Sequence, residues 1–138
     1  MTMGRAIIRP AVPGDIPALQ KLQKEELPDA DGSVVPRKSW LEYIGSGFTV
    51  VAELDGKTVG FVSGEPLLDA GAIIHFFIID KKHRGTRLTG ALCDGFEERL
   101  RQSGVEWVHG YAEPRAAMFY KRRGASLGHE LIETLKYL

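Results

Sequence analysis

Apolar residues along the chain recur with two spacings, one typical of strands and one typical of helices. Short runs rich in β-branched and aromatic residues, bounded by glycine, proline or aspartate, predict strands. Apolar residues three and four positions apart predict helices that bury one face. The predicted strands are Ala6–Arg9, Phe48–Leu54, Thr58–Ser63, Ala72–Ile79, Val105–Ala112 and a final extended segment, Leu127–Leu138. The predicted helices are Asp15 to about Leu27, Pro36–Ile44, a helix that carries Leu88, Leu92, Phe96 and Leu100 and is closed by Gly104, and Arg115–Arg123.

Local signals refine these elements, and their order along the chain predicts the fold class. Asp15 is expected to cap the first helix. Asp55-Gly56 is the strongest short-range hairpin signal, and Ala72–Ile79, dominated by Ile and Phe, predicts a central strand buried on both faces. The residues of the second helix expected to face the core are Trp40, Leu41 and Ile44. The element order predicts an α/β (α+β) fold with a mixed, mostly antiparallel sheet and helices on both faces.

Composition narrows the classes of protein that remain. The chain has 138 residues, enough for one domain, and its 18 basic and 18 acidic side chains give a formal net charge of zero. This balance disfavours a nucleic-acid binder that works by bulk electrostatics. The longest nearly apolar run, Ala70–Ile79, is far shorter than the ~18 residues of a membrane span, and no signal peptide is evident. We therefore expect a cytoplasmic protein with neither a membrane nor a nucleic acid as partner.

The sequence also disfavours disulfide and metal chemistry. Cys93 is the only cysteine, so the chain has no intrachain disulfide and no cysteine-rich zinc site. The four histidines show no ligand-like pairing with it or with one another, and we expect no metal. Because no basic partner for Cys93 is evident, we interpret it as a small packing residue and not as a nucleophile.

The most informative stretch is a basic, glycine-containing loop between a predicted strand and a predicted helix. A helix start carries unpaired N–H groups and partial positive charge, which stabilise phosphate groups. The loop residues that would cradle a diphosphate are Arg84, Gly85, Thr86, Arg87, Leu88, Thr89 and Gly90. Ala91-Leu92 follows in place of the Lys-Ser/Thr of a nucleoside triphosphatase loop, and no dinucleotide fingerprint is present. The alternative to a phosphate cradle is a solvated basic turn.

Four segments in this order and spacing resemble the GNAT superfamily of N-acetyltransferases. They are Ile8–Ala11 with Gly14–Ile16, the hairpin Val51–Phe61, Phe77–Ile79 running into His83–Leu92, and Ala117–Ala125. The resemblance implies one acetyltransferase domain over residues 1–138 and transfer of an acetyl group from acetyl-CoA to a primary amine by direct attack. The loop departs from the family pattern, because Arg87 replaces the middle glycine and Thr89 the last one. Pro114 stands where a cofactor-contacting asparagine is common.

These departures keep two other functions open. One is a non-catalytic acyl-CoA-binding or regulatory module on the same fold. The other is an interaction module whose basic loop binds phosphate-bearing partners, nucleic acid included. Selective stabilisation by acetyl-CoA would favour the enzyme or the acyl-CoA-binding module over the interaction module. Release of free thiol in the presence of an amine would then favour the enzyme.

The resemblance also assigns roles to individual residues. The main chain of Phe77, Ile78 and Ile79 is expected to hold the pantetheine arm and polarise the acetyl carbonyl. Tyr120 is the candidate general acid, because its reference pKa of ~10 lies above the ~8.5 of a thiol, so it enters the reaction protonated. His75 and, less strongly, Glu65 are candidates for the general base, and water is a third possibility. For each of these side chains a purely structural role in the core or at the surface is the alternative.

The acceptor is expected to be a small-molecule or peptide amine. In this fold the connection between the first two helices borders the acceptor groove, and carboxylates there would attract a cationic amine. These carboxylates are Glu25, Glu26, Asp29 and Asp31. The alternative is a solvated helix end. A homodimer is also expected from the resemblance.

Overall fold

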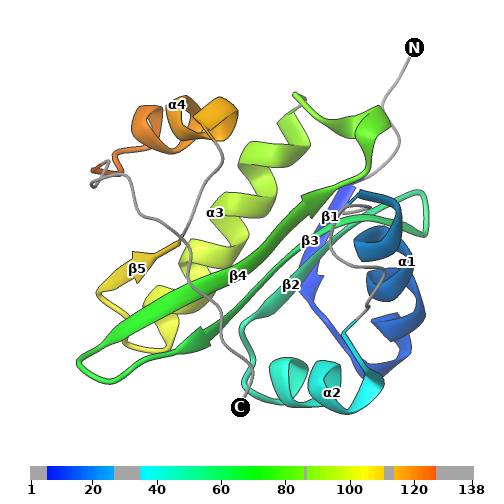
Figure 1. Ribbon diagram of the computed structural model, residues 1–138, viewed down its shortest axis with the longest axis horizontal. Coiled ribbons are helices and arrows are strands. Elements are labelled where there is room, and N and C mark those ends of the chain that lie inside the picture. The colour runs from blue at the N-terminus through cyan, green and yellow to red at the C-terminus, as the bar shows by residue number, and fades with distance from the viewer. Residues whose placement is uncertain (1–5, 27–34, 86, 111–113, 127–138) are drawn as a thin grey trace, which may run out of the picture.

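A single five-stranded sheet forms the centre of the protein, in the spatial order β1-β2-β3-β4-β5 (Figure 1). This computed structural model describes residues 6–26, 35–85, 87–110 and 114–126. The strands are β1 (Ala6–Pro10), β2 (Thr49–Leu54), β3 (Lys57–Pro66), β4 (Gly71–Ile79) and β5 (Trp107–His109). The pairs from β1 to β4 are antiparallel, and β5 is parallel to β4. The predicted mixed, mostly antiparallel sheet is therefore confirmed, whereas the segment Leu127–Leu138 lies outside the described residues.

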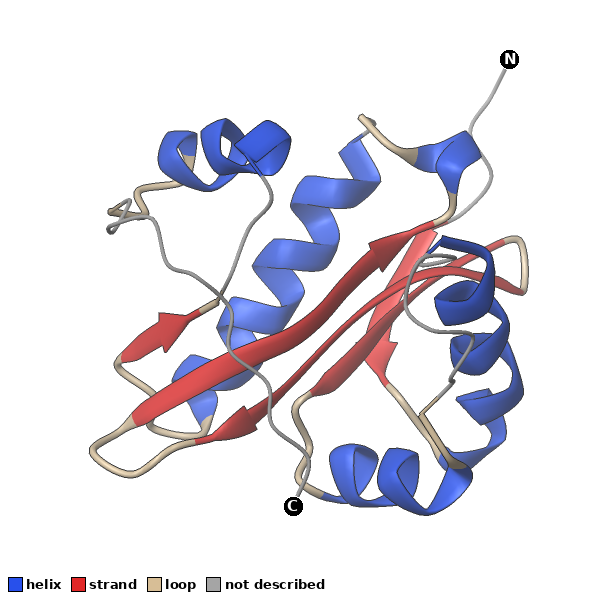
Figure 2. Ribbon diagram, in the orientation of Figure 1, coloured by secondary structure: helices blue, strands red, loops and turns tan. Residues whose placement is uncertain are grey.

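Helices cover both faces of this sheet, as Figure 2 shows. The helices are α1 (Ile16–Glu26), α2 (Arg37–Gly45), α3 (Arg87–Gln102) and α4 (Pro114–Arg122), with short 3-10 turns at Pro13–Asp15 and Lys81–His83. Helices α1 and α2 lie on one face and α3 lies on the other. Helix α3 makes the crossover between the parallel strands β4 and β5.

The alternation of side chains along β2 divides the core into two layers. Val50 and Ala52 are buried against α3, whereas Val51 between them is buried against α1 and α2. The layer under α3 includes Val59, Val62, Ala72, Ile79, Leu88, Leu92, Phe96 and Leu100. The layer under α1 and α2 includes Ile16, Leu19, Leu22, Trp40, Phe61 and Ile78. A strand with apolar residues on both faces therefore anchors the two helical layers to each other.

The β2–β3 hairpin turns at Asp55-Gly56, as predicted from the sequence. Asp55 has φ of 51° and Gly56 has φ of 79°. Two central residues with positive φ are the mark of a type I′ turn, whose twist matches that of the flanking strands. This turn fixes the register in which Leu54 lies opposite Lys57.

One inward-facing residue of α2 was predicted wrongly. Leu41 is 42% exposed, whereas Trp40 is fully buried and Tyr43 and Ile44 pack against the same layer. Residues three and four positions after Trp40 share its face, but a residue one position after it is rotated by about 100°. The side chain that sequence reasoning missed on this face is Tyr43.

Asp15 directly precedes α1, but its side chain accepts from Val12, the residue that precedes the 3-10 turn, and not from an N–H of α1 as predicted. Its carboxylate accepts the Val12 backbone N–H at 2.8 Å and binds the Arg9 guanidinium through two contacts of 2.8 Å. Arg9 also donates to Glu53 of β2 at 2.9 Å. The Arg9 guanidinium lowers the pKa of Asp15, against the opposing effect of burial. This network ties β1 to β2 and to the start of α1.

Strand β4 is less buried than its apolar sequence predicts. Ala72, Ile78 and Ile79 are buried, but the residues between them are only half-buried and His75 is exposed. The expectation of a strand buried on both faces along its whole length is therefore wrong. The reason lies in the pairing of β4 with its short neighbour β5.

Candidate functional site

Among the residues that the structure describes, no strand pairs with most of the β4 edge that faces β5. β5 pairs with β4 at only three positions, from Gly71 opposite Trp107 to Ile73 opposite His109. Among the described residues, none continues this ladder beyond Ile73. Within the described part of the chain, the main chain from His75 to Ile79 thus has no strand neighbour on this side, next to the start of α3.

The register of β3 and β4 decides which main-chain groups face this opening. The Asp80 N–H donates to the Val59 carbonyl at 2.7 Å, so residue 80 directs its main-chain groups toward β3. In an antiparallel ladder alternate residues do the same. Ile78 therefore points its N–H and C=O toward β3, whereas Phe77 and Ile79 point theirs toward the opening. Of the three residues predicted to hold a pantetheine arm, these two have the required direction.

A β-bulge lies in the middle of β4. Ser63 is opposite Phe76 but Gly64 is opposite Ile74, so His75 is an extra residue on the β4 side. Bulges of this kind redirect a side chain and are frequent beside active sites. The bulge makes His75 and Phe76 both contact residues of α2, on one face of the sheet.

His75 and Glu65, the two sequence-predicted base candidates, form one pair. His75 Nε2 lies 2.9 Å from Glu65 Oε1, with the side chains 28% and 49% exposed. The His75 ring also lies against Tyr43, with the ring centroids 5.6 Å apart. The imidazole is thus held between a carboxylate and an aromatic ring while it stays accessible to solvent.

The guanidinium of Arg84 is already engaged within the protein. It donates to the Glu26 carboxylate at the end of α1, and its Nε donates to the Ile79 carbonyl at 3.2 Å. The same carboxylate accepts the Lys81 N–H at 3.3 Å. Glu26 therefore faces the basic loop and not an acceptor groove. Of the other carboxylates predicted to attract the acceptor, Glu25 lies 4.0 Å from Lys21, and Asp29 and Asp31 lie outside the described residues.

The remaining loop residues leave space at the start of α3. Gly85 has φ of +71°, a left-handed conformation, and nothing lies within 4 Å of the position a Cβ would take. At Gly90 the nearest atom to such a Cβ is an Arg123 nitrogen at 3.8 Å. Arg87, the first residue of α3, is exposed, and Leu88 is buried in the core. Thr86 lies outside the described residues.

These features suit an anion such as a diphosphate. At the two glycines, which lie at the N-terminal end of a helix, a ligand can approach the main chain closely. Such a position favours the binding of an anion. Thr89 adds a buried hydroxyl that has no hydrogen-bond partner among the described residues. A buried polar group without a partner costs roughly 1–3 kcal/mol, which a ligand atom would offset.

Tyr120 of α4 lies beside β4 on the face opposite to His75. Its ring is edge-on to Phe77, with the centroids 6.3 Å apart. Burial raises the pKa of the Tyr120 hydroxyl, and a negative charge at Cys93 would raise it further. Burial also raises the pKa of the Cys93 thiol, which agrees with its interpretation as a packing residue.

Arg123, which sequence reasoning missed, fastens α4 to α3. Its guanidinium binds Asp94 and lies 3.2 Å from Glu97 Oε2. It also lies over the Phe119 ring at 5.7 Å from the centroid. The pairing positions the helix that carries Tyr120. The sequence signal for Arg123 was its place as a basic residue just after an apolar helix. No sequence signal pointed to Asp94 and Glu97 of α3 as its partners.

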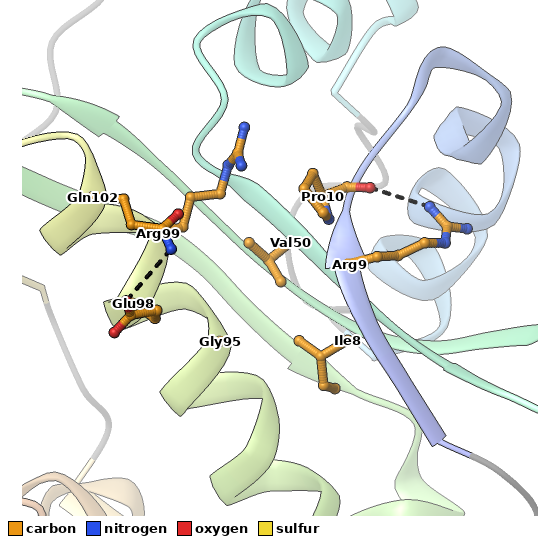
Figure 3. Close-up of a pocket in the computed structure, with 8 residues that line it drawn as sticks. All are labelled: Ile8, Arg9, Pro10, Val50, Gly95, Glu98, Arg99 and Gln102. Carbon is orange, nitrogen blue, oxygen red and sulfur yellow. Dashed lines mark hydrogen bonds between the residues drawn. The ribbon is translucent and has the colours of Figure 1, made fainter.

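A shallow groove of about 220 Å³ lies at the other end of the sheet, between β1 and α3 (Figure 3). The residues lining it are Ile8, Arg9, Pro10, Val50, Gly95, Glu98, Arg99 and Gln102. None of them belongs to the sequence-predicted site. Arg99, which lines this groove, donates from its Nε to the Gly47 carbonyl.

Two further features concern the described part of the chain only. Within it, no three His, Cys, Asp or Glu side chains are grouped closely enough to hold a metal ion. None of the helices described in it combines the length and the apolar character required to cross a membrane.

Comparison with known proteins gives a consistent assignment. Residues 16–125 match the model of the acetyltransferase (GNAT) family. No curated protein matches significantly. Among solved structures, Ard1 from Thermoplasma volcanium has 22% identity and a TM-score of 0.77, covering 90% of this chain and 84% of that one.

Two other solved structures cover the chain almost completely. An aminoglycoside acetyltransferase from an uncultured soil metagenomic sample has 17% identity and a TM-score of 0.80, with 96% of each chain covered. Glucosamine-6-phosphate N-acetyltransferase from Arabidopsis thaliana has 19% identity and a TM-score of 0.74, covering 96% of this chain and 98% of that one. At these identities the structures show a shared fold.

Proposed function

This chain belongs to the GNAT acetyltransferase family, and we propose that it transfers an acetyl group from acetyl-CoA directly to a primary amine within a ternary complex. The observation that carries the proposal is the open edge of β4, which His75 and Tyr120 flank from opposite faces of the sheet. Two of the matched structures are named for acetyltransferases of amino-bearing small molecules, which supports a small-molecule acceptor here.

The main chain and the loop would hold the co-substrate. Acetyl-CoA supplies a thioester, whose carbonyl carbon accepts the amine. Phe77 and the N–H of Ile79 would face the arm, whereas the Ile79 carbonyl accepts from Arg84 Nε. An N–H aimed at the thioester carbonyl oxygen would stabilise the charge that develops there. Gly85, Gly90 and the N-terminus of α3 would receive the diphosphate. Arg87, exposed at the first position of α3, adds a cationic donor.

His75 would act as the general base, oriented by Glu65. The amine must lose a proton before or during its attack. With His75 neutral and its Nε2–H donated to Glu65, the lone pair lies on Nδ1, which is then the atom that accepts the amine proton. Glu65 stabilises the imidazolium that results. It is therefore a positioning residue in this scheme.

Tyr120 would assist the departure of CoA. As the C–N bond forms and the C–S bond breaks, negative charge collects on sulfur. The raised pKa of Tyr120 keeps its hydroxyl protonated at neutral pH, ready to donate. Because a thiol has a reference pKa of ~8.5, complete proton transfer from the tyrosine is uphill. Its main contribution is thus a strong hydrogen bond to the thiolate.

Release of free thiol from acetyl-CoA in the presence of an amine panel tests the proposal. Tyr120→Phe should lower kcat by about 100-fold or more, since general acids contribute about 10²–10⁴, while the Kd for acetyl-CoA stays within about twofold. His75→Ala should remove the acidic limb of the pH–rate profile. An unaltered limb would exclude His75 as the base.

A second measurement separates this enzyme from a non-catalytic module. Thermal unfolding is followed with acetyl-CoA, CoA and an unrelated polyphosphate. Stabilisation by acetyl-CoA without thiol release for any amine would indicate an acyl-CoA-binding module. An equal response to any polyanion would indicate phosphate binding by the basic loop alone.

A further inference from the structure

The groove between β1 and α3 has two walls of different chemistry (Figure 3). One wall belongs to β1 and β2 and presents mainly apolar side chains, those of Ile8, Pro10 and Val50. The other wall belongs to the second half of α3 and presents three polar side chains, those of Glu98, Arg99 and Gln102. None of these residues belongs to the proposed acetyl-CoA site. A ligand in this groove would therefore bind independently of the acetyl donor.

Arg99 supplies a guanidinium whose position is fixed by the main chain. Its Nε donates to the Gly47 carbonyl. A Cβ at residue 47 would lie 3.1 Å from Arg99 Nη2, so the glycine leaves room for the guanidinium. This hydrogen bond uses only one of the N–H donors of the group, and the others remain available to an acceptor.

Arg99 differs from the other half-buried arginines of the described structure in having no acidic partner. Arg9 and Arg123 are buried to a similar degree, and each binds two carboxylates. Within the described ranges, no Asp or Glu forms an ion pair with Arg99. A charge that is partly withdrawn from water is unfavourable unless it is paired, so an anion that reaches Arg99 is stabilised there.

Glu98 also lines the groove, but other groups balance its charge. Its Oε2 lies 3.6 Å from Arg101 Nη1, and its Oε1 accepts from Gln102 Nε2 at 3.4 Å. Its side chain is exposed, so water screens the charge further. The Arg9 guanidinium is turned away from the groove toward its own carboxylates. The charge left over at the groove is therefore the positive charge of Arg99.

The two walls together define the chemistry of a ligand. A carboxylate matches the fork of a guanidinium and accepts two of its N–H groups in parallel. An aliphatic chain attached to that carboxylate would cover the apolar wall. Because the volume of about 220 Å³ is below the roughly 300–1,000 Å³ of pockets that hold drug-sized molecules, the chain has to be short. Inorganic phosphate would leave the apolar wall uncovered.

We propose that the groove between β1 and α3 is a binding site for a small carboxylate with a short aliphatic chain. Its carboxylate binds Arg99, and its chain lies on Ile8 and Val50. Because the ligand contacts the sheet and α3 together and binds the folded protein only, it stabilises the fold by mass action.

The experiment compares hexanoate with hexanol and hexylamine, which have the same alkyl chain and a different head group. Butyrate tests the chain, and inorganic phosphate tests the charge alone. The readout is the Kd from backbone amide shifts, followed at Ile8, Val50 and Gly95. We expect hexanoate to bind about tenfold or more tightly than hexanol and hexylamine, because they cannot replace its charge-assisted hydrogen bonds. It should also bind about tenfold more tightly than butyrate, because two methylene groups are lost.

Two variants test the contribution of Arg99. Arg99→Gln should reduce the preference for hexanoate over hexanol to within about twofold of unity, because it removes the charge. Gln102→Glu changes an exposed position and keeps the contact between Arg99 and Gly47, so it tests the charge of the groove without disturbing the fold. It should lower the preference by about threefold or more. Arg37→Gln is the matched control, because it removes an exposed guanidinium from α2 and should leave the preference unchanged.

Several results would overturn the inference. They are no saturable binding of hexanoate, equal binding of hexanoate and hexanol, phosphate binding as tight as that of hexanoate, and a preference that survives both Arg99→Gln and Gln102→Glu. Shifts confined to amides outside the groove would also overturn it. The same Kd values are expected in the presence of CoA, and thiol release from acetyl-CoA is measured separately. Failure of this inference therefore leaves the acetyltransferase proposal standing.

Discussion

Arg84 belongs to the basic loop predicted to bind phosphate, yet its contacts favour a second role, that of positioning the loop. Glu26 holds its guanidinium, and the Glu26 side chain is only 12% exposed. The perturbation that separates the two roles is Glu26→Gln. If Arg84 were a phosphate ligand, this change would free it and remove a negative charge near an anionic ligand, so acetyl-CoA would bind more tightly. If Glu26 and Arg84 together position the loop, acetyl-CoA binds less tightly.

The magnitude follows from the contacts that are lost. Hydrogen bonds to charged groups contribute roughly 1.5–3 kcal/mol. Because the Arg84 side chain is 44% exposed, water compensates for part of the lost hydrogen bond, and the net loss is about 1 kcal/mol. That corresponds to about a fivefold weaker Kd for acetyl-CoA in Glu26→Gln. Arg84→Gln should weaken binding similarly, and the double variant should lose about fivefold and not about 25-fold.

Isothermal titration of the four proteins with acetyl-CoA measures this cycle. Lys82→Gln is the matched control, since it removes a positive charge from the same loop without touching Glu26. Subtracting its effect corrects Arg84→Gln for the loss of charge. Tighter binding by Glu26→Gln, or strictly additive effects in the double variant, would refute the positioning role.

Three other predictions concern the framework of the site. Gly64→Ala should destabilise the protein by about 1–3 kcal/mol in denaturant unfolding, because the new Cβ would lie 2.4 Å from the Ile73 carbonyl oxygen; a change below about 0.5 kcal/mol would contradict this. Because the pKa of Asp15 is lowered in the folded protein, Asp15 stabilises the fold fully above its unfolded pKa of ~3.9, and this stabilisation is lost as the pH falls below that value. Asp15→Asn should therefore flatten the acid side of the curve of stability against pH. Thermal unfolding between pH 2 and 7 at ~1 pH intervals measures this. Arg123→Lys should speed amide exchange in α4 more than in α3, since the Arg123 guanidinium contacts Asp94 and Glu97 through Nη2 while its plane lies over the Phe119 ring, a combination that an ammonium cannot reproduce; uniform exchange would argue against it.

Local patterns predicted the elements that local interactions determine. The Asp55-Gly56 turn, the apolar face of α3 and the order of helices and strands along the chain all follow from short-range spacing. Tyr43 was missed because Leu41 and Tyr43 are both apolar enough for the inner face. Only the angle around the helix axis between each residue and Trp40 shows which of the two faces the core. The phase of a short helix is poorly defined by nine residues.

Long-range features of the site had no such signal. Val105–Ala112 has the composition of one continuous strand, but β5 ends at His109, which opens the edge of β4. Arg84 and Glu26 are 58 positions apart, so nothing near the loop indicates that its arginine is engaged. The bulge at His75 is accommodated by Gly64 on the neighbouring strand, where a side chain would strike the Ile73 carbonyl.

The short ladder between β4 and β5 has a consequence for the protein without its co-substrate. In the described part of the chain, no strand pairs with β4 from His75 onward, and amide and carbonyl groups left unpaired along a strand are a template for aggregation with another polypeptide. Occupation by an acyl carrier would shield this stretch of backbone from other chains. Depletion of the carrier should therefore affect the solubility of this protein as well as its turnover.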